Sequence, residues 1–252
     1  MTATEHGATG AEPSADAPDP APRWGAADVI VAFLVAQLAS AIGFVLFAAA
    51  EGVPAAELDR DVLTIGEIAL LQVPLWLGLF GVPLIATRVR GNGPRRDLGL
   101  WSTLADAPIG LAIGVACQLV LVPLVTLPVF LLSDTDQEAL EAPARELTDK
   151  AQGPGVLVLV LVVVVAAPLA EEVFFRGMLQ RTFARRWPIW PSMLATSILF
   201  GVSHFQLLQL PALAAFGLVL SLIAHRTGRL GRNIWAHVGF NATTVVALLL
   251  GG

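Results

Sequence analysis

A single stretch decides the fold, because in it ten aliphatic residues lead directly into three charged ones. It reads Val-Leu-Val-Leu-Val-Leu-Val-Val-Val-Val at 156–165 and then Ala-Ala-Pro-Leu-Ala-Glu-Glu-Val-Phe-Phe-Arg-Gly at 166–177. In lipid only a helix satisfies its own backbone hydrogen bonds within one segment, so the stretch predicts a membrane helix despite its strand-like composition. A charged residue at the centre of such a helix costs about 2.5–3.5 kcal/mol, whereas each aliphatic residue contributes only about 0.3–0.6 kcal/mol. The charges of Glu171, Glu172 and Arg176 therefore indicate a functional site within the membrane.

The rest of the chain has the composition of an integral membrane protein. Of its 252 residues, 56% are hydrophobic and only 14% are charged, against about 25% charged residues in soluble domains. We predict an all-α, polytopic transmembrane helical bundle of about seven spans. The spans are expected at 26–50, 62–87, 107–132, 155–177, 191–208, 210–224 and 234–250. We predict a disordered N-terminal tail at 1–25 and a membrane domain at 26–252. The single cysteine, Cys117, excludes a disulfide within the chain.

The charges between the spans predict an orientation. Arginines cluster in 88–96, 181–186 and 226–232, which fall on one side if the spans alternate, and the opposite segments 51–61 and 133–150 are mostly acidic. Positively charged loops stay in the cytoplasm. We therefore expect a cytoplasmic N-terminus in a bacterial plasma membrane and, with the charged cluster late in its span, a site facing the cytoplasm. Segment 137–150 could form an interfacial helix on the outer face. The short basic clusters do not indicate nucleic-acid binding.

The three charges of the cluster divide into a pair and a single carboxylate. Glu172 and Arg176 are four residues apart with the acid first, which is the favourable order for an ion pair on one helix face. Glu171 points about 100° away from Glu172, and its positions i+3 and i+4 are Phe174 and Phe175. Glu171 is therefore the candidate for a desolvated carboxylate acting as a general base.

Two later spans carry polar residues that could meet this carboxylate. His204 follows Ser197 and Gly201 at helical spacing in the fifth span, where the small residues allow another helix to approach closely. His237 and Asn241 are four residues apart in the last span and point the same way. Two convergent donors suit an oxyanion, and they equally suit a polar clamp between helices. We predict that Glu171, His204, His237 and Asn241 lie together.

Three motifs in these segments resemble the CPBP family, also called Abi. Its motifs Glu-Glu-x-x-x-Arg, Phe-x-x-x-His and His-x-x-x-Asn correspond to residues 171–176, 200–204 and 237–241, in the same order and each on its own apolar segment. The family includes type II CaaX prenyl endopeptidases and bacteriocin-processing or self-immunity proteins. The resemblance covers roughly 155–250, and the first three spans carry no motif.

The resemblance implies an intramembrane endopeptidase. By the match, Glu171 would activate a water with help from His204, while His237 and Asn241 would stabilise the oxyanion. Glu172 and Arg176 would orient the site. The family has been described both as metalloendopeptidases and as glutamic endopeptidases. Glu171, His204 and His237 could ligate zinc, but the His-Glu-x-x-His pairing of helical zinc proteases is absent. We therefore favour a metal-free glutamate mechanism, with no cofactor established.

The expected partners are the lipid bilayer and a hydrophobic or prenylated peptide substrate. No residue pattern in the sequence indicates recognition of a prenyl group. The sequence also does not determine the physiological substrate or the oligomeric state. Two other functions remain open at this point. One is a non-catalytic membrane immunity or scaffold protein of the same family, and the other is a proton-coupled transporter that uses Glu171. The transporter is less favoured because the sequence has no inverted repeat.

Overall fold

The computed structural model describes residues 21–132 and 137–251, and within these ranges it contains helices and no strand. The helices are α1 (Ala26–Ala50), α2 (Ile65–Trp76), α3 (Val82–Arg90), α4 (Pro94–Asp97), α5 (Asp106–Ala116), α6 (Val122–Leu132), α7 (Gln137–Asp149), α8 (Gly155–Leu159), α9 (Ala167–Glu172), α10 (Gln180–Ala184), α11 (Ile189–Val202), α12 (Leu210–Thr227) and α13 (Gly231–Gly251). A short 3-10 turn covers Arg60–Val62. Wide π-helical turns at Leu77–Gly81, Cys117–Leu121, Val160–Ala166 and Val173–Leu179 join neighbouring helices without interrupting them.

Among the described residues, six of the resulting helices are long and apolar enough to cross a membrane. They are Ala26–Ala50, Ile65–Arg90, Asp106–Leu132, Gly155–Ala184, Leu210–Thr227 and Gly231–Gly251. The predicted all-α polytopic bundle is confirmed, and the chain is an integral membrane protein. The fifth expected span, at 191–208, is instead the 14-residue α11, which is short of the roughly 20 residues needed to cross the hydrocarbon core. The chain turns after Val202 and returns as α12.

The helix that carries the charged cluster is longer than the sequence suggested. The cluster was expected at the far end of the fourth span, in its cytoplasmic half. The structure continues this helix to Ala184, so Glu171 lies near the middle of a helix of 30 residues. The wide turn Val173–Leu179 follows directly and is buried throughout. Segments of this kind occur frequently at functional sites in helices.

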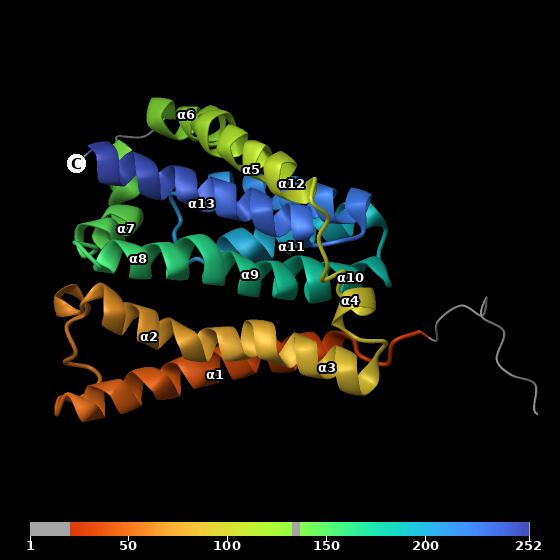
Figure 1. Ribbon diagram of the computed structural model, residues 1–252, viewed down its shortest axis with the longest axis horizontal. Helices are drawn as coiled ribbons and strands as arrows, with labels where there is room; N and C mark the ends of the chain where they lie inside the picture. The colour runs from red at the N-terminus through yellow and green to blue at the C-terminus, as the bar shows by residue number, and fades with distance from the viewer. Residues whose placement is uncertain (1–20, 133–136, 252) are drawn as a thin grey trace, which may run out of the picture.

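The helices run along one long axis, as Figure 1 shows, with α1, α2 and α3 on one side of α8–α10 and α13, α5 and α6 on the other. The outer face of α1 carries apolar side chains at helical spacing that remain 50–64% exposed, namely Ile30, Leu34, Leu38, Ile42 and Leu46. A soluble domain would bury such a stripe, whereas in a membrane it faces lipid. Beneath it, the core includes Phe174, Phe175 and Phe200.

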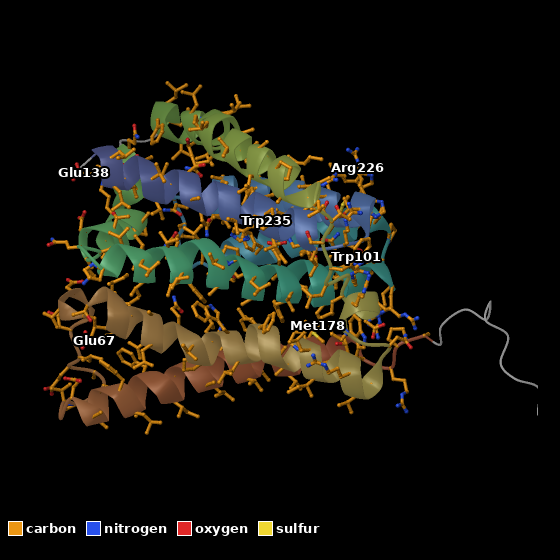
Figure 2. The ribbon with its side chains drawn as sticks, in the orientation of Figure 1. Glu67, Trp101, Glu138, Met178, Arg226 and Trp235 are labelled. Carbon is orange, nitrogen blue, oxygen red and sulfur yellow. The ribbon has the colours of Figure 1, made fainter. Side chains whose placement is uncertain are left out.

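The predicted clustering of arginines on one side is present in the structure. Arg181 donates to the carbonyl of Gly228, and Arg185 stacks on Trp24, 4.0 Å from its ring centroid. Arg229 forms two hydrogen bonds of 2.8 and 2.9 Å to the buried carboxylate of Asp106. These contacts tie the loops at this end together, and we call it the arginine end. Glu138 and Arg226 lie at opposite ends of the bundle (Figure 2).

The last residues of the predicted tail, Arg23 and Trp24, pack on the bundle. Trp24 is buried and its indole donates to Asp97 at 2.8 Å, and the backbone N–H of Arg23 donates to the carbonyl of Arg90. The boundary at residue 25 is therefore too late, because the chain already packs on the bundle at 23. The remainder of the predicted tail, 1–20, lies outside the described residues.

Close packing of α5 on α13 depends on glycines. A Cβ added at Gly114 would fall on the backbone carbonyl oxygen of Ala236 and lie 2.6 Å from the amide nitrogen of Phe240. Across the same contact, a Cβ at Gly239 would lie 2.7 Å from the carbonyl oxygen of Leu111. Only hydrogen fits between the two backbones, as in other membrane helices packed through small residues. This contact fixes α13, which carries His237 and Asn241.

We expect Gly114→Ala to destabilise the protein by about 1–3 kcal/mol, the usual effect of overpacking, and to lower its melting temperature in detergent. Gly81→Ala is the matched control, because a Cβ there meets nothing within 4 Å. That control should be neutral or slightly stabilising, since glycine in a helix is worse than alanine by roughly 0.5–1 kcal/mol. Equal melting temperatures for the two variants would contradict close backbone contact at Gly114.

Candidate active site

Glu171 faces two imidazoles from other parts of the chain. Its Oε2 lies 4.0 Å from Nε2 of His204 and 3.8 Å from Nε2 of His237. The Oε2 atom is buried and has no hydrogen-bond partner in the protein, although the side chain as a whole is 20% exposed. A buried carboxylate oxygen without a partner is costly. The gap between Glu171 and the two imidazoles is therefore a place for a water or a substrate group.

Glu172 and Arg176 form the predicted ion pair. Arg176 Nη1 donates to Glu172 Oε1 at 2.8 Å, and both side chains are 0% exposed. Arg176 also donates through Nη2 to the carbonyl of Gly217, and its guanidinium lies 4.4 Å from the ring centroid of Phe200. The pair therefore joins the central helix to α11 and α12. Glu172 points into the core and Glu171 toward an open space, as their helical spacing predicted.

His237 lies between the two carboxylates. Its Nδ1 is 3.0 Å from Glu172 Oε1, and its Nε2 faces Glu171. Because an ionised carboxylate only accepts hydrogen bonds, Nδ1 carries the proton and donates to Glu172. In the neutral imidazole Nε2 then presents a lone pair to Glu171, and in the protonated imidazole it presents an N–H. The rings of Phe200 and Phe216 contact His237 edgewise and fix its plane.

His204 lies in the turn after α11. From the sequence, a position within a helix was expected instead. Its Nδ1 is 2.8 Å from the carbonyl oxygen of Phe200, which only accepts, so Nδ1 donates and Nε2 faces Glu171 with its lone pair. The side chain is 27% exposed. Phe205, the next residue, takes a positive φ of 55°, which reverses the chain here. Ser197 and Gly201 are buried against α12, so the close helix approach predicted from them is confirmed.

Asn241 lines the same space one turn beyond His237. Its Nδ2 donates to the carbonyl of Val163 at 2.8 Å, which leaves the second amide N–H for another acceptor. Glu171, His204, His237 and Asn241 all line one cavity of about 560 Å³. Ligand pockets commonly measure about 300–1,000 Å³. The structure therefore brings the four predicted residues to the wall of a single chamber.

Sequence reasoning missed several residues of the site. Asn233 is fully buried and donates to the carbonyl of Leu220 at 2.6 Å and to Glu172 Oε2 at 3.4 Å. Gln72 and Gln118, from segments without motifs, line the cavity, and Oε1 of Gln118 is buried without a partner. A polar amide within an apolar span was the available signal for both glutamines. Asn233 stands near a predicted span end, where a polar residue is ordinary.

The three groups that could ligate zinc do not fit the ion as placed. With metal–ligand bonds of about 2.0–2.1 Å, tetrahedral ligands lie about 3.3 Å apart, and the separations from Glu171 are 3.8 and 4.0 Å. Within residues 21–132 and 137–251 no group of three His, Cys, Asp or Glu side chains is arranged to hold a metal ion. The mechanism proposed below therefore includes no step through zinc.

The fold and site define a class: a polytopic membrane protein with a glutamate and two histidines enclosed in its helical bundle. Comparison with known proteins supports a narrower grouping. Residues 153–243 match the Rce1-like family, described as type II CAAX prenyl endopeptidase Rce1-like. This match confirms the family resemblance drawn from the three motifs, and it includes all six site residues. The matched family is one of proteases.

One curated relative and the solved structures complete the comparison. The chain is 35% identical over 132 residues to a 24.3 kDa protein of Escherichia coli described as uncharacterized. The alignment covers 49% of this chain and 58% of the relative, so the similarity spans little more than half of that protein. No solved structure matches the chain.

Proposed function

We propose that the protein is an intramembrane endopeptidase that hydrolyses a peptide bond of a hydrophobic segment through a water activated by Glu171. The observation that carries the proposal is the unpartnered Oε2 of Glu171, which faces Nε2 of both histidines at 3.8 and 4.0 Å at the inner end of the cavity. The match to a protease family supports the same reaction.

The first step is addition of water to the scissile carbonyl. A water between Glu171 and His204 can donate one hydrogen to each, which turns an oxygen lone pair toward the substrate. As the carbon–oxygen bond forms, the proton leaves the water for Glu171, and the carbonyl oxygen becomes an oxyanion. General-base assistance of this kind contributes about 10²–10⁴-fold.

The second step is collapse of the tetrahedral intermediate. The carbon–nitrogen bond breaks, and the proton held by Glu171 passes to the departing amine, directly or through Nε2 of His204. His237 in its protonated form and the second amide N–H of Asn241 are the donors for the oxyanion. Within the described residues, Arg176 pairs with Glu172, and the printed partners of the second carboxylate, Glu171, are the two imidazoles. A proton on His237 would balance the remaining charge, which favours its role as an N–H donor.

Cleavage of a peptide library by the purified protein in liposomes tests the proposal, with Glu171→Gln as the deciding variant. Wild type should cleave peptides that contain an apolar segment, and the variant should not. Equal function of wild type and Glu171→Gln in cells, without cleavage by either, would favour an immunity or scaffold protein. Proton-coupled flux that vanishes with Glu171→Gln would favour a transporter.

We expect cleavage to persist after treatment with a strong zinc chelator, because the ligand separations are wider than zinc requires. Zinc content, measured on the active protein, should be well below one ion per chain. A chelator-resistant soluble control protease excludes effects of the chelator on the assay. Loss of cleavage on chelation and its recovery with added zinc would show instead that Glu171, His204 and His237 hold the metal.

We further propose that the protein resides in a bacterial plasma membrane with its arginine end in the cytoplasm, by the positive-inside rule. The sequence-based expectation of a site facing the cytoplasm rested on the charged cluster lying late in its span. Because Glu171 lies near the middle of its helix, depth alone no longer selects a side. The direction in which the cavity extends from Glu171 gives further evidence on the side of the membrane that the site faces.

A further inference from the structure

We infer that the substrate reaches Glu171 from the end of the bundle where α7 lies, opposite the arginine end, and that it is an apolar polypeptide segment presented on the non-cytoplasmic side. The inference rests on the proposed function for what the occupant is, but the route can be tested without cleavage. It reverses the side expected from the sequence.

The lining of the cavity extends from the site toward the α7 end of the bundle. At its inner end it is lined by Ala167, Glu171, His204 and His237. Away from the site its walls are the terminal parts of helices at the α7 end: Phe130 near the end of α6, Leu159 in α8 and Ala247 near the end of α13. α7 itself contributes Gln137, Leu140, Glu141, Ala144, Leu147 and Thr148. Figure 1 places α7 beside the C-terminus at one end of the bundle.

Toward the arginine end the site is closed by packed side chains. Glu172, Val173, Arg176 and Met178 are all 0% exposed, and Leu98 and Leu230 are equally buried beyond them. A Cβ at Gly177 would meet Leu98 and Leu230 at 3.2–3.3 Å, so no space remains there. The hydrogen bond from Leu230 N to the carbonyl of Gly99 closes the loops over this region. A peptide cannot approach Glu171 from the arginine end without unpacking the core.

The walls of the cavity suit a peptide in an apolar setting. α7 turns Leu140, Ala144 and Leu147 inward at helical spacing, and its other face carries exposed Glu138, Glu146 and Asp149. An extended backbone within the membrane needs hydrogen-bond partners. Gln118 offers a buried Oε1 without a partner, and the amide of Gln72 lines the same wall. A hydrocarbon chain alone would leave these amides unsatisfied, so the wall favours a polypeptide.

Cysteine labelling tests the side of entry. In a Cys117→Ala background, which removes the native thiol, Glu138→Cys and Arg226→Cys place single thiols at exposed positions at the two ends (Figure 2). A membrane-impermeant maleimide added to intact cells should label Glu138→Cys, and inside-out vesicles should be needed to label Arg226→Cys. The opposite labelling pattern would overturn the assignment of the α7 end to the non-cytoplasmic side. The route through the α7 end is tested separately, by blocking the cavity.

Blocking the cavity tests the route. A bulky disulfide adduct on Ala144→Cys, in the cavity wall, should abolish peptide cleavage, and reduction should restore it. The same adduct on Ala184→Cys, an exposed alanine at the arginine end, should leave cleavage unchanged. Inhibition by the adduct at Ala184→Cys but not at Ala144→Cys would overturn the route.

A labelling readout separates this inference from the proposed function. Ala167→Cys lies deep in the cavity beside Glu171, and a small maleimide should reach it at a rate that a bulky adduct at Ala144→Cys reduces. Unchanged labelling would refute entry at the α7 end even if Glu171→Gln abolishes cleavage. Reduced labelling together with full activity of Glu171→Gln would refute the protease and retain the route.

Discussion

Glu171→Gln is expected to lower kcat for peptide cleavage by about 10²–10⁴-fold, the usual contribution of a general base. Glutamine has nearly the same shape but cannot accept a proton from water at neutral pH. Because Oε2 of Glu171 has no hydrogen-bond partner in the protein, its replacement removes little native stabilisation, and the melting temperature in detergent should stay within a few degrees. The loss should appear in kcat rather than in KM, since the carboxylate acts on the water and not on binding.

The matched control is Glu57→Gln, an exposed carboxylate in the loop before α2, which should cleave like wild type. Single-turnover rates would show that the defect lies in the chemical step. Retention of full kcat by a folded Glu171→Gln protein would rule out the water-activating role and, with it, the proposed function.

The sequence predicted what depends on local spacing. Glu172 and Arg176 are one helical turn apart, so their ion pair and the different direction of Glu171 follow from helix geometry. The three motifs picked out six candidate residues that the structure brings close together, because each motif lies within one segment. The arginine segments predicted one shared end, which the contacts of Arg181, Arg185 and Arg229 bear out.

Features that depend on contacts between distant segments were harder to predict from the sequence. The apolar run of the fifth segment continues through Leu207 and Leu208. The helix predicted from this composition is therefore longer than α11, which ends at Val202. The polar residues Ser203, His204 and Gln206 were the only local sign of the turn. Asn233, one of the partners of Glu172, is 61 positions away along the chain, and no periodicity links the two. The cavity joins walls from α2, α6, α7 and α13 and has no local signature at all.

Arg176→Met is expected to have the largest effect on stability. It leaves the carboxylate of Glu172 at 0% exposure without its cation, and breaking a buried pair in this way typically costs about 3–5 kcal/mol. The guanidinium also contacts Phe200 and the carbonyl of Gly217, so α11 and α12 lose a shared anchor. We expect a sharply lower melting temperature in detergent and little folded protein.

The double variant Glu172→Gln/Arg176→Met separates the effect of the buried charges from the effect of holding the His237 imidazole in place. It removes both buried charges, and replacement of a buried pair by neutral groups is often close to neutral for stability, so most of the lost melting temperature should return. The amide oxygen of the new side chain can still accept from Nδ1 of His237, which holds the imidazole in place. It no longer supports a positive charge on that ring, so cleavage should stay low while the fold recovers.

A double variant as unstable as Arg176→Met would assign the loss to packing around the guanidinium instead. A double variant that is both stable and fully active would show that His237 needs no buried carboxylate, and the oxyanion role assigned to its protonated form would then fail.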